Sequence, residues 1–96
     1  YIGATPSNGF ANFRSYIESN IQNPASMNTG QREVVILSIT IDGLGKIKNI
    51  KPVRSPGEEF TSEAKRLIMS GPAWKPATQN GDTITDNVRL RIIFKL

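Results

Sequence analysis

Apolar residues recur along the chain with several spacings, and the first spacing predicts a helix. Near the start of the chain, intervals of three and four residues place a set of apolar side chains on one helical face: Phe10, Phe13, Ile17 and Ile21. The preceding segment, Ser7-Asn8-Gly9, offers side chains that can cap a helix. Asn23-Pro24 stops it, because a residue before proline is disfavoured in the α region. The pattern predicts a helix from about Gly9 to Gln22.

The next apolar segment, Val34 to Ile41, is nearly continuous and rich in β-branched residues, which indicates a strand with neighbours on both sides. Asp42 to Gly45 contains two glycines and predicts a hairpin loop. The partner strand is expected from Lys46 to about Arg54. Pro52 lacks an amide hydrogen, so this strand belongs on an edge. Ile50 breaks the alternation of its apolar residues, which favours a bulge or a twisted edge.

A second helix is predicted after the hairpin. Ser55-Pro56-Gly57-Glu58 has the form of a capped helix start, and Thr61 is a competing cap. The buried face of this helix is expected to contain Phe60, Ala64, Leu67 and Ile68, and Gly71-Pro72 ends it.

The last part of the chain predicts a long loop and then a strand. Ala73 to Asp86 is expected to be loop-like, with a tight turn at Asn80-Gly81-Asp82. In the final segment apolar residues alternate with cations: Val88, Leu90, Ile92, Phe94 and Leu96 against Arg89, Arg91 and Lys95. Alternation of this kind predicts a strand with one buried face.

These elements predict an α+β fold with the order α-β-β-α-β. The simplest arrangement is a three-stranded antiparallel sheet with both helices packed on one face. A chain of 96 residues suits one domain, residues 1–96. Because the sequence begins at Tyr1 without a methionine, we expect a domain cut from a longer protein.

The composition argues against catalysis. The chain has no cysteine and no histidine, so it lacks thiol chemistry and the commonest general base and metal ligand. A serine or threonine nucleophile would have no histidine as its activating base, and Glu58, Glu59 and Glu63 are typical of the charges at a helix start. The acidic residues show no ligand-like spacing. We expect no enzyme activity, no cofactor and no metal.

The net charge of +4 comes from two basic groups. One runs from Lys46 to Arg54 and contains no acid; the other is Arg89, Arg91 and Lys95. Such groups can bind nucleic acid, anionic lipid or an acidic partner. Cations on strand edges also discourage aggregation of sheets, which accounts for them without any ligand.

A set of residues spaced along the whole chain resembles the pattern of a known family. The set comprises Phe13, Tyr16-Ile17, Asn20 and Pro24; Asp42, Gly45 and Ile47; Ser55 and Gly57; Ala64; Pro72, Trp74, Pro76 and Ala77; Asn80-Gly81; and Ile93, Phe94 and Leu96. In this order and spacing, from about Pro6 to Leu96, it resembles the TonB carboxy-terminal domain family. Members often carry a tyrosine before the proline that follows the first helix, where this chain has Asn23.

The resemblance implies a periplasmic, cell-envelope domain of a Gram-negative bacterium with a protein or peptide partner. It implies that the last strand is an edge on which a transporter's amino-terminal motif pairs by β-augmentation. The partner-binding residues are then Val88, Arg89, Leu90, Arg91, Ile92, Ile93 and Phe94. Trp74 is expected to anchor its loop against the sheet edge, with an interface role as the alternative.

Two other functions stay open at the level of sequence. The domain could be a regulatory or scaffolding module that packs on its parent protein or forms a homodimer. It could also bind nucleic acid or a cell-wall polymer through the Lys46–Arg54 group, although aromatic stacking residues are not interleaved with those cations. A membrane association is expected only through an anchor upstream of Tyr1.

Overall fold

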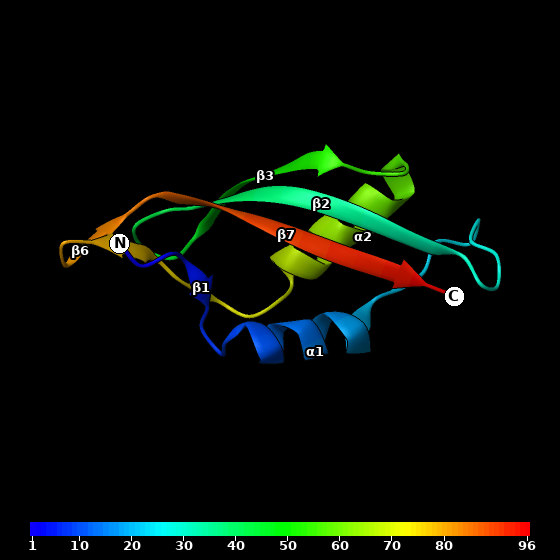
Figure 1. The fold of residues 1–96 in the computed structure, drawn as a ribbon, viewed down its shortest axis with the longest axis horizontal. Coiled ribbons are helices and arrows are strands. Elements are labelled where there is room, and N and C mark those ends of the chain that lie inside the picture. The colour runs from blue at the N-terminus through cyan, green and yellow to red at the C-terminus, as the bar shows by residue number, and fades with distance from the viewer.

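Three long strands form the centre of the structure, and the apolar run predicted from the sequence is the middle one. The computed structural model describes residues 1–96, and the two termini lie at opposite ends of an elongated molecule (Figure 1). Strand β2 (Arg32–Ile41) lies between β3 (Ile47–Arg54) and β7 (Asp86–Lys95), and both pairings are antiparallel. The expected edge position of the strand containing Pro52 is confirmed.

Both helices contribute to a core on one face of this sheet. Helix α1 (Phe10–Asn20) and helix α2 (Glu58–Met69) bury the following residues: Phe13 and Ile17 from α1, and Phe60, Ala64, Leu67 and Ile68 from α2. The buried strand residues are Val35, Leu37, Ile39, Ile41, Leu90, Ile92 and Phe94. Each fully buried Leu, Ile or Phe side chain stabilises the fold by roughly 1.5–3 kcal/mol. The predicted α+β class is confirmed.

The buried residues of β2 and β7 all have one parity along their strands, so the other face of the sheet carries no helix. We call that other surface the open face. Neither helix combines the length and the apolar character that crossing a bilayer requires.

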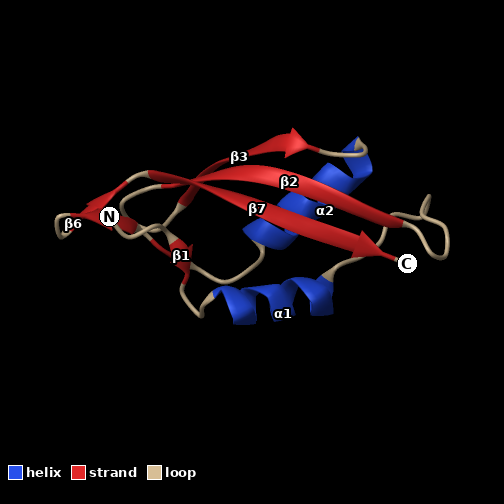
Figure 2. Cartoon of the chain, viewed as in Figure 1, coloured by secondary structure: helices blue, strands red, loops and turns tan.

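The prediction of a loop from Ala73 to Asp86 is wrong. This segment contains β4 (Trp74–Lys75), β5 (Ala77–Gln79) and β6 (Asp82–Ile84), as Figure 2 shows by colour for the strands around β6. Strand β4 pairs with β1 (Thr5–Pro6), and β5 pairs with β6 around the predicted tight turn. Strands of two or three residues are too short to establish an alternating pattern, so no periodicity in the sequence predicts them.

The predicted side-chain caps are also wrong. Glycines occupy the N-cap positions of both helices, Gly9 and Gly57, and neither helix start has a capping side-chain hydrogen bond. Ser55 and Thr61 instead bond to each other, with the Thr61 hydroxyl donating to Ser55 Oγ at 2.6 Å. At its other end α1 stops at Asn20, two residues before the predicted end, because the backbone of Ile21 is already extended.

Strand β3 has the irregularity predicted from Ile50. Its pairing with β2 shifts register at two places, between Ile36 and Leu37 and between Thr40 and Ile41. The shift near Thr40 lets Ile47 and Ile50 both pack against the core, although they are three residues apart. Strand β7, by contrast, pairs with β2 through ten consecutive residues without a shift. The two edges of the sheet therefore differ, and only β7 offers a regular one.

The hairpin between β2 and β3 explains the Asp42-x-x-Gly45 pattern. Asp42 Oδ1 accepts hydrogen bonds from the amides of Leu44 and Lys46, each at 2.9 Å, and these bonds lower the pKa of the Asp42 carboxyl. Gly45 has a φ of 81°, and a Cβ atom at this position would lie 2.3 Å from the carbonyl oxygen of Trp74. Glycine is required here by both the backbone conformation and the space.

Candidate functional site

The outer edge of β7 is the only regular strand edge of the central sheet. The pairing with β2 shows which backbone N–H and C=O groups of β7 point toward β2 and which point away from it. The amide of Leu96 donates to the carbonyl of Gln31, which continues the β2–β7 pairing by one residue. In an antiparallel ladder the direction of the backbone groups alternates. Hence the N–H and C=O groups of Arg89, Arg91 and Ile93 point away from β2. They are free to pair with an added strand.

Asn23 closes one end of this edge. Its Nδ2 donates to the outward carbonyl oxygen of Lys95 at 2.9 Å, a bond that independently supports the direction assigned above. Asn23 Oδ1 is buried and has no hydrogen-bond partner. The residue that departs from the family pattern thus touches the predicted docking strand directly.

The amino-terminal segment bounds the edge at its other end. Asp86, the first residue of β7, accepts hydrogen bonds from the Tyr1 hydroxyl at 2.6 Å and from the amide of Ala4 at 3.2 Å. The bond from Tyr1 lowers the pKa of Asp86, and the same bond raises the pKa of Tyr1. The unobstructed part of the edge is therefore the stretch Val88–Ile93.

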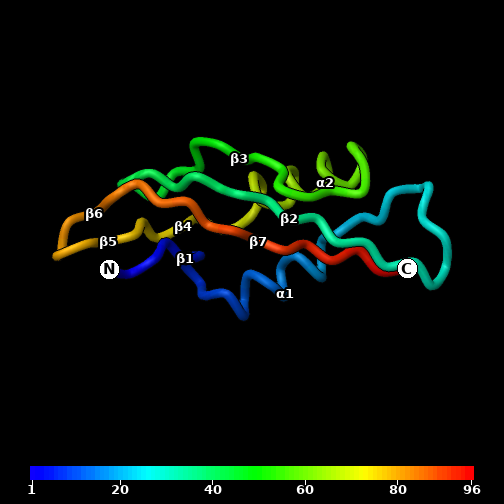
Figure 3. The backbone as a smooth tube through the Cα atoms, turned by 45° about the horizontal axis from the view of Figure 1, so that its top comes forward, coloured from blue at the N-terminus to red at the C-terminus, as the bar shows by residue number.

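A groove of about 700 Å³ runs beside this stretch, between β7 and α1. Figure 3 shows α1 lying alongside β7, as Figure 1 does from another direction. The wall from α1 comprises Phe10, Phe13, Arg14, Ile17, Glu18 and Ile21, and the wall from β7 comprises Arg89, Leu90, Arg91, Ile92, Ile93 and Lys95. A strand laid against β7 would enter this groove, and its side chains on the helix side would meet mostly apolar surface.

The predicted partner-binding residues divide into two sets on β7. Leu90, Ile92 and Phe94 point into the core, and Val88 packs against it. Arg89 and Arg91 are exposed on the open face, and Ile93 is half-buried there. The structure brings all seven into one strand, but they act differently. The second set supplies the free backbone groups, while Leu90 and Ile92 supply the groove wall.

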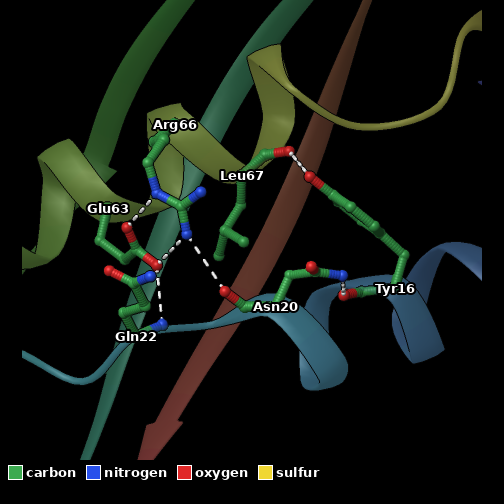
Figure 4. A network of polar contacts seen from close by, with 6 residues as sticks. All are labelled: Tyr16, Asn20, Gln22, Glu63, Arg66 and Leu67. Atoms are coloured by element: carbon green, nitrogen blue, oxygen red, sulfur yellow. Dashed lines mark hydrogen bonds and ion pairs between the residues drawn. The ribbon is translucent and has the colours of Figure 1, made fainter.

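Helix α1 is held at its carboxyl end by an ion pair on α2. Arg66 and Glu63 form a two-pronged contact, Nε to Oε1 at 2.6 Å and Nη2 to Oε2 at 2.7 Å (Figure 4). Glu63 Oε2 also accepts from the amide of Gln22 at 2.7 Å, and Arg66 Nη2 donates to the carbonyl of Asn20 at 3.1 Å. The bonds from Arg66 and then from Gln22 lower the pKa of Glu63. The last two of these bonds tie α2 to the carboxyl end of α1 and the residues just after it.

The same side of α1 makes a further contact with α2, because the Tyr16 hydroxyl donates to the carbonyl of Leu67 at 2.8 Å (Figure 4). At the amino-terminal end of α1, the Trp74 ring meets Phe13 edge-on at a centroid distance of 5.5 Å and Phe10 at 6.2 Å. Trp74 is buried, so it anchors its segment as predicted, and its aromatic contacts are with α1. The width of the groove is therefore set at both ends of the helix.

Two residues of this surface differ from what the sequence predicts. The helical pattern predicts Phe10 on the buried face, yet it is 43% exposed at the groove. In the sequence, Asn23 stands out only as a departure from the family pattern. A sequence signal for Phe10 existed in its place at the helix start, where an apolar residue has fewer neighbours; no signal pointed Asn23 towards Lys95. Acidic side chains do not gather into a group that could hold a metal ion.

Comparison with protein families gives one match, to the model described as the Gram-negative bacterial TonB protein C-terminal, over residues 24–96. The chain belongs to this family. Its members are envelope proteins whose C-terminal domains interact with outer-membrane proteins, so a protein partner is expected for this domain as well. A search of curated proteins finds no match. The family match starts at Pro24, so α1, one wall of the groove, lies outside the matched residues.

Proposed function

We propose that this TonB-like domain is a non-enzymatic module that docks an extended peptide on the outer edge of β7. The observation that carries the proposal is the free stretch Val88–Ile93, with outward backbone groups and a groove beside it. An extended peptide that adds a strand gains main-chain hydrogen bonds for affinity and side-chain pockets for specificity. The amino-terminal motif of an outer-membrane transporter is the partner that family membership favours.

The groove defines what such a peptide needs. Its residues would alternate between the helix side and the open face. On the helix side they would contact Phe13, Ile17 and Leu90, which favours apolar side chains of moderate size. On the open face they would lie beside Arg89 and Arg91, which favours polar or acidic side chains. Acidic and apolar residues in alternation therefore describe the best occupant.

The first test is an NMR titration of the labelled domain with short peptides from transporter amino termini. Docking on the edge predicts amide shifts concentrated on Arg89, Arg91 and Ile93, whose N–H groups form the new bonds. Shifts confined to α2, or none at millimolar peptide, would contradict the proposal. That second outcome would favour the regulatory or scaffolding alternative, in which the domain packs on its parent protein or on a second copy.

Two substitutions of Arg91 distinguish the contribution of its backbone N–H to peptide binding from the contribution of its side chain. Arg91→Pro removes an outward N–H and leaves the bonds to β2 intact, because proline is tolerated on an edge strand when its nitrogen faces outward. Arg91→Ala removes the side chain and keeps the N–H. We expect the proline variant to bind peptide roughly fivefold more weakly than the alanine variant, since it lacks a main-chain bond worth about 1 kcal/mol. Equal affinities in two folded variants would argue that the edge makes no such bond.

A further inference from the structure

The fold brings cations from both basic groups of the sequence onto one surface. Strands β3 and β7 flank β2, and the pairing sets Lys51 and Arg89 on either side of Ser38. The next row across the open face sets Arg54 and Arg91 on either side of Ile36. Residues that are far apart along the chain thus form rows of cations across the sheet, on the side that no helix covers.

The open face is strongly and uniformly positive. Its exposed cations are Arg32, Lys51, Arg54, Arg89, Arg91 and Lys95, half of the 12 in the chain. None of the 8 acidic residues lies at an open-face position of the three strands. The charge of this face therefore exceeds the net charge of +4 for the whole chain.

These cations have no anionic neighbour within the protein. The two ion pairs of the structure are Lys48 with Asp42 at 3.6 Å and Arg66 with Glu63 at 2.6 Å, and neither uses an open-face cation. Arg32 and Lys95 even lie directly opposite each other across the β2–β7 ladder. Like charges in that position destabilise a sheet. An external anion would relieve this repulsion.

The form of the open face identifies the class of anion. The cations form a two-dimensional array and not a single line. Both surface grooves are bounded by a helix, and no residue of β2, the middle of the open face, lines either of them. No aromatic residue occupies an open-face position to stack on a base or a sugar. Between the cations, Val34, Ile36 and Ile93 are half-buried and do not project.

We infer that the open face binds the surface of a membrane containing anionic phospholipid. Arginine forks bind phosphate oxygens through two parallel hydrogen bonds, and four of the six cations are arginines. The half-buried apolar residues fit contact with headgroups and not insertion among acyl chains. Binding of this kind is peripheral, and it uses all the cationic side chains of the open face. Peptide docking uses the backbone edge, the groove and, of these cations, only Arg89 and Arg91.

The test is co-sedimentation of the chain with vesicles of phosphatidylethanolamine and phosphatidylglycerol, and with vesicles that lack phosphatidylglycerol. We expect binding to the anionic vesicles alone, and release by added salt. Absence of binding at low salt, or equal binding to both kinds of vesicle, would overturn the inference. Binding to soluble inorganic polyphosphate without binding to anionic vesicles would overturn it too, and would assign the face to a soluble polyanion.

A matched pair of double variants localises the effect. Lys51→Gln with Arg89→Gln removes two cations from one row of the open face, whereas Lys65→Gln with Lys75→Gln removes two cations from α2 and β4. Each cation near an anionic surface contributes roughly a fivefold factor in affinity, so we expect roughly 25-fold weaker vesicle binding for the first variant and little change for the second. Equal weakening in both would reduce the effect to net charge and overturn the inference. Circular dichroism verifies that each variant is folded.

Discussion

The side-chain amide of Asn23 donates a hydrogen bond to the carbonyl oxygen of Lys95 at 2.9 Å, and so joins the segment after α1 to the end of the docking strand. Asn23 thus occupies an outward backbone group of β7 and shortens the free edge by that group. The unpaired Oδ1 of the same amide keeps the contribution of this contact to stability small.

Substitutions of Asn23 measure this contact. Asn23→Ala removes the bond and also the buried unpaired Oδ1, so we expect a loss of less than about 1 kcal/mol in the free energy of unfolding. Asn23→Asp places carboxylate oxygens near the Lys95 carbonyl without a donor, and we expect a larger loss of about 1–3 kcal/mol at pH 7. Urea unfolding of the three proteins gives these values.

The stability of the Asn23→Asp variant is expected to depend on pH. A half-buried carboxyl group beside a carbonyl has its pKa raised in the folded state, so the cost is present above that pKa and disappears as the group is protonated. We expect the aspartate variant to approach the alanine variant in stability as the pH falls to about 3. An aspartate variant as stable as the alanine variant at pH 7 would show that the Asn23–Lys95 contact is absent in solution.

The Glu63–Arg66 pair makes the stability of the fold depend on pH in the acidic range. The folded-state pKa of Glu63 is lowered, so its contribution is present above the unfolded pKa of about 4.3 and is lost as the pH falls through the lower folded value. We expect Glu63→Gln to lower Tm by a few degrees, roughly 3–5 °C, at pH 7, and to differ little from the unchanged chain near pH 2. Thermal unfolding followed by circular dichroism measures both.

Glu18→Gln is the control for this experiment, because Glu18 is an exposed carboxylate of α1 without a hydrogen bond or ion pair. Its Tm at pH 7 should stay within a degree or two of the unchanged chain. If both glutamine variants lost the same stability with the same pH profile, the contact between the helices would not be the cause.

Alanine substitutions at Gly45 and Gly81 distinguish the cost of a steric clash from the cost of backbone strain. Both have positive φ, 81° and 85°, but a Cβ atom at Gly45 would lie 2.3 Å from the Trp74 carbonyl, whereas one at Gly81 meets nothing within 4 Å. We expect Gly81→Ala to cost about 1 kcal/mol and Gly45→Ala at least about 3 kcal/mol in the free energy of unfolding. Chemical denaturation measures both losses in the free energy of unfolding. Similar losses in the two variants would mean that the hairpin moves away from Trp74 easily.

Phe10 is expected to contribute to peptide affinity. It lines the groove and is 43% exposed, so an added strand can cover it. We expect Phe10→Ala to weaken peptide binding about tenfold, the range of a contact at the centre of an interface. Leu44→Ala is the control, since Leu44 is 80% exposed at the tip of the β2–β3 hairpin. Titration calorimetry that showed equal affinities for both variants would remove Phe10 from the binding surface.

The long elements could be predicted from the sequence because each carried a complete physical pattern. The continuous apolar run of Val34–Ile41 indicates a strand with neighbouring strands on both sides, and Pro52 excludes its strand from the centre of a sheet. The helix starts were less predictable. Ser55 and Thr61 have the chemistry of caps, but each satisfies the other, a pairing that depends on the path of the chain between them.

The candidate site was predictable only in part. Alternation located β7 and the family pattern implied its free edge, but the groove depends on where α1 lies, and that is set by contacts distant in sequence such as Tyr16 with Leu67. The meeting of the two basic groups on the open face depends on the bulges of β3, which decide the side on which Lys51 and Arg54 project. No local pattern reports such a shift.

The contacts at Asp86 and Lys95 give the docking edge a fixed length. Between them, the stretch Val88–Ile93 spans about 20 Å at the usual rise of a strand, and main-chain pairing stops where Tyr1 and Asn23 begin. Under the proposed docking, we expect a peptide to gain affinity with each residue until it fills this length, and residues beyond it to add none. We therefore expect the domain to select partners by the length of their extended segment as well as by their sequence.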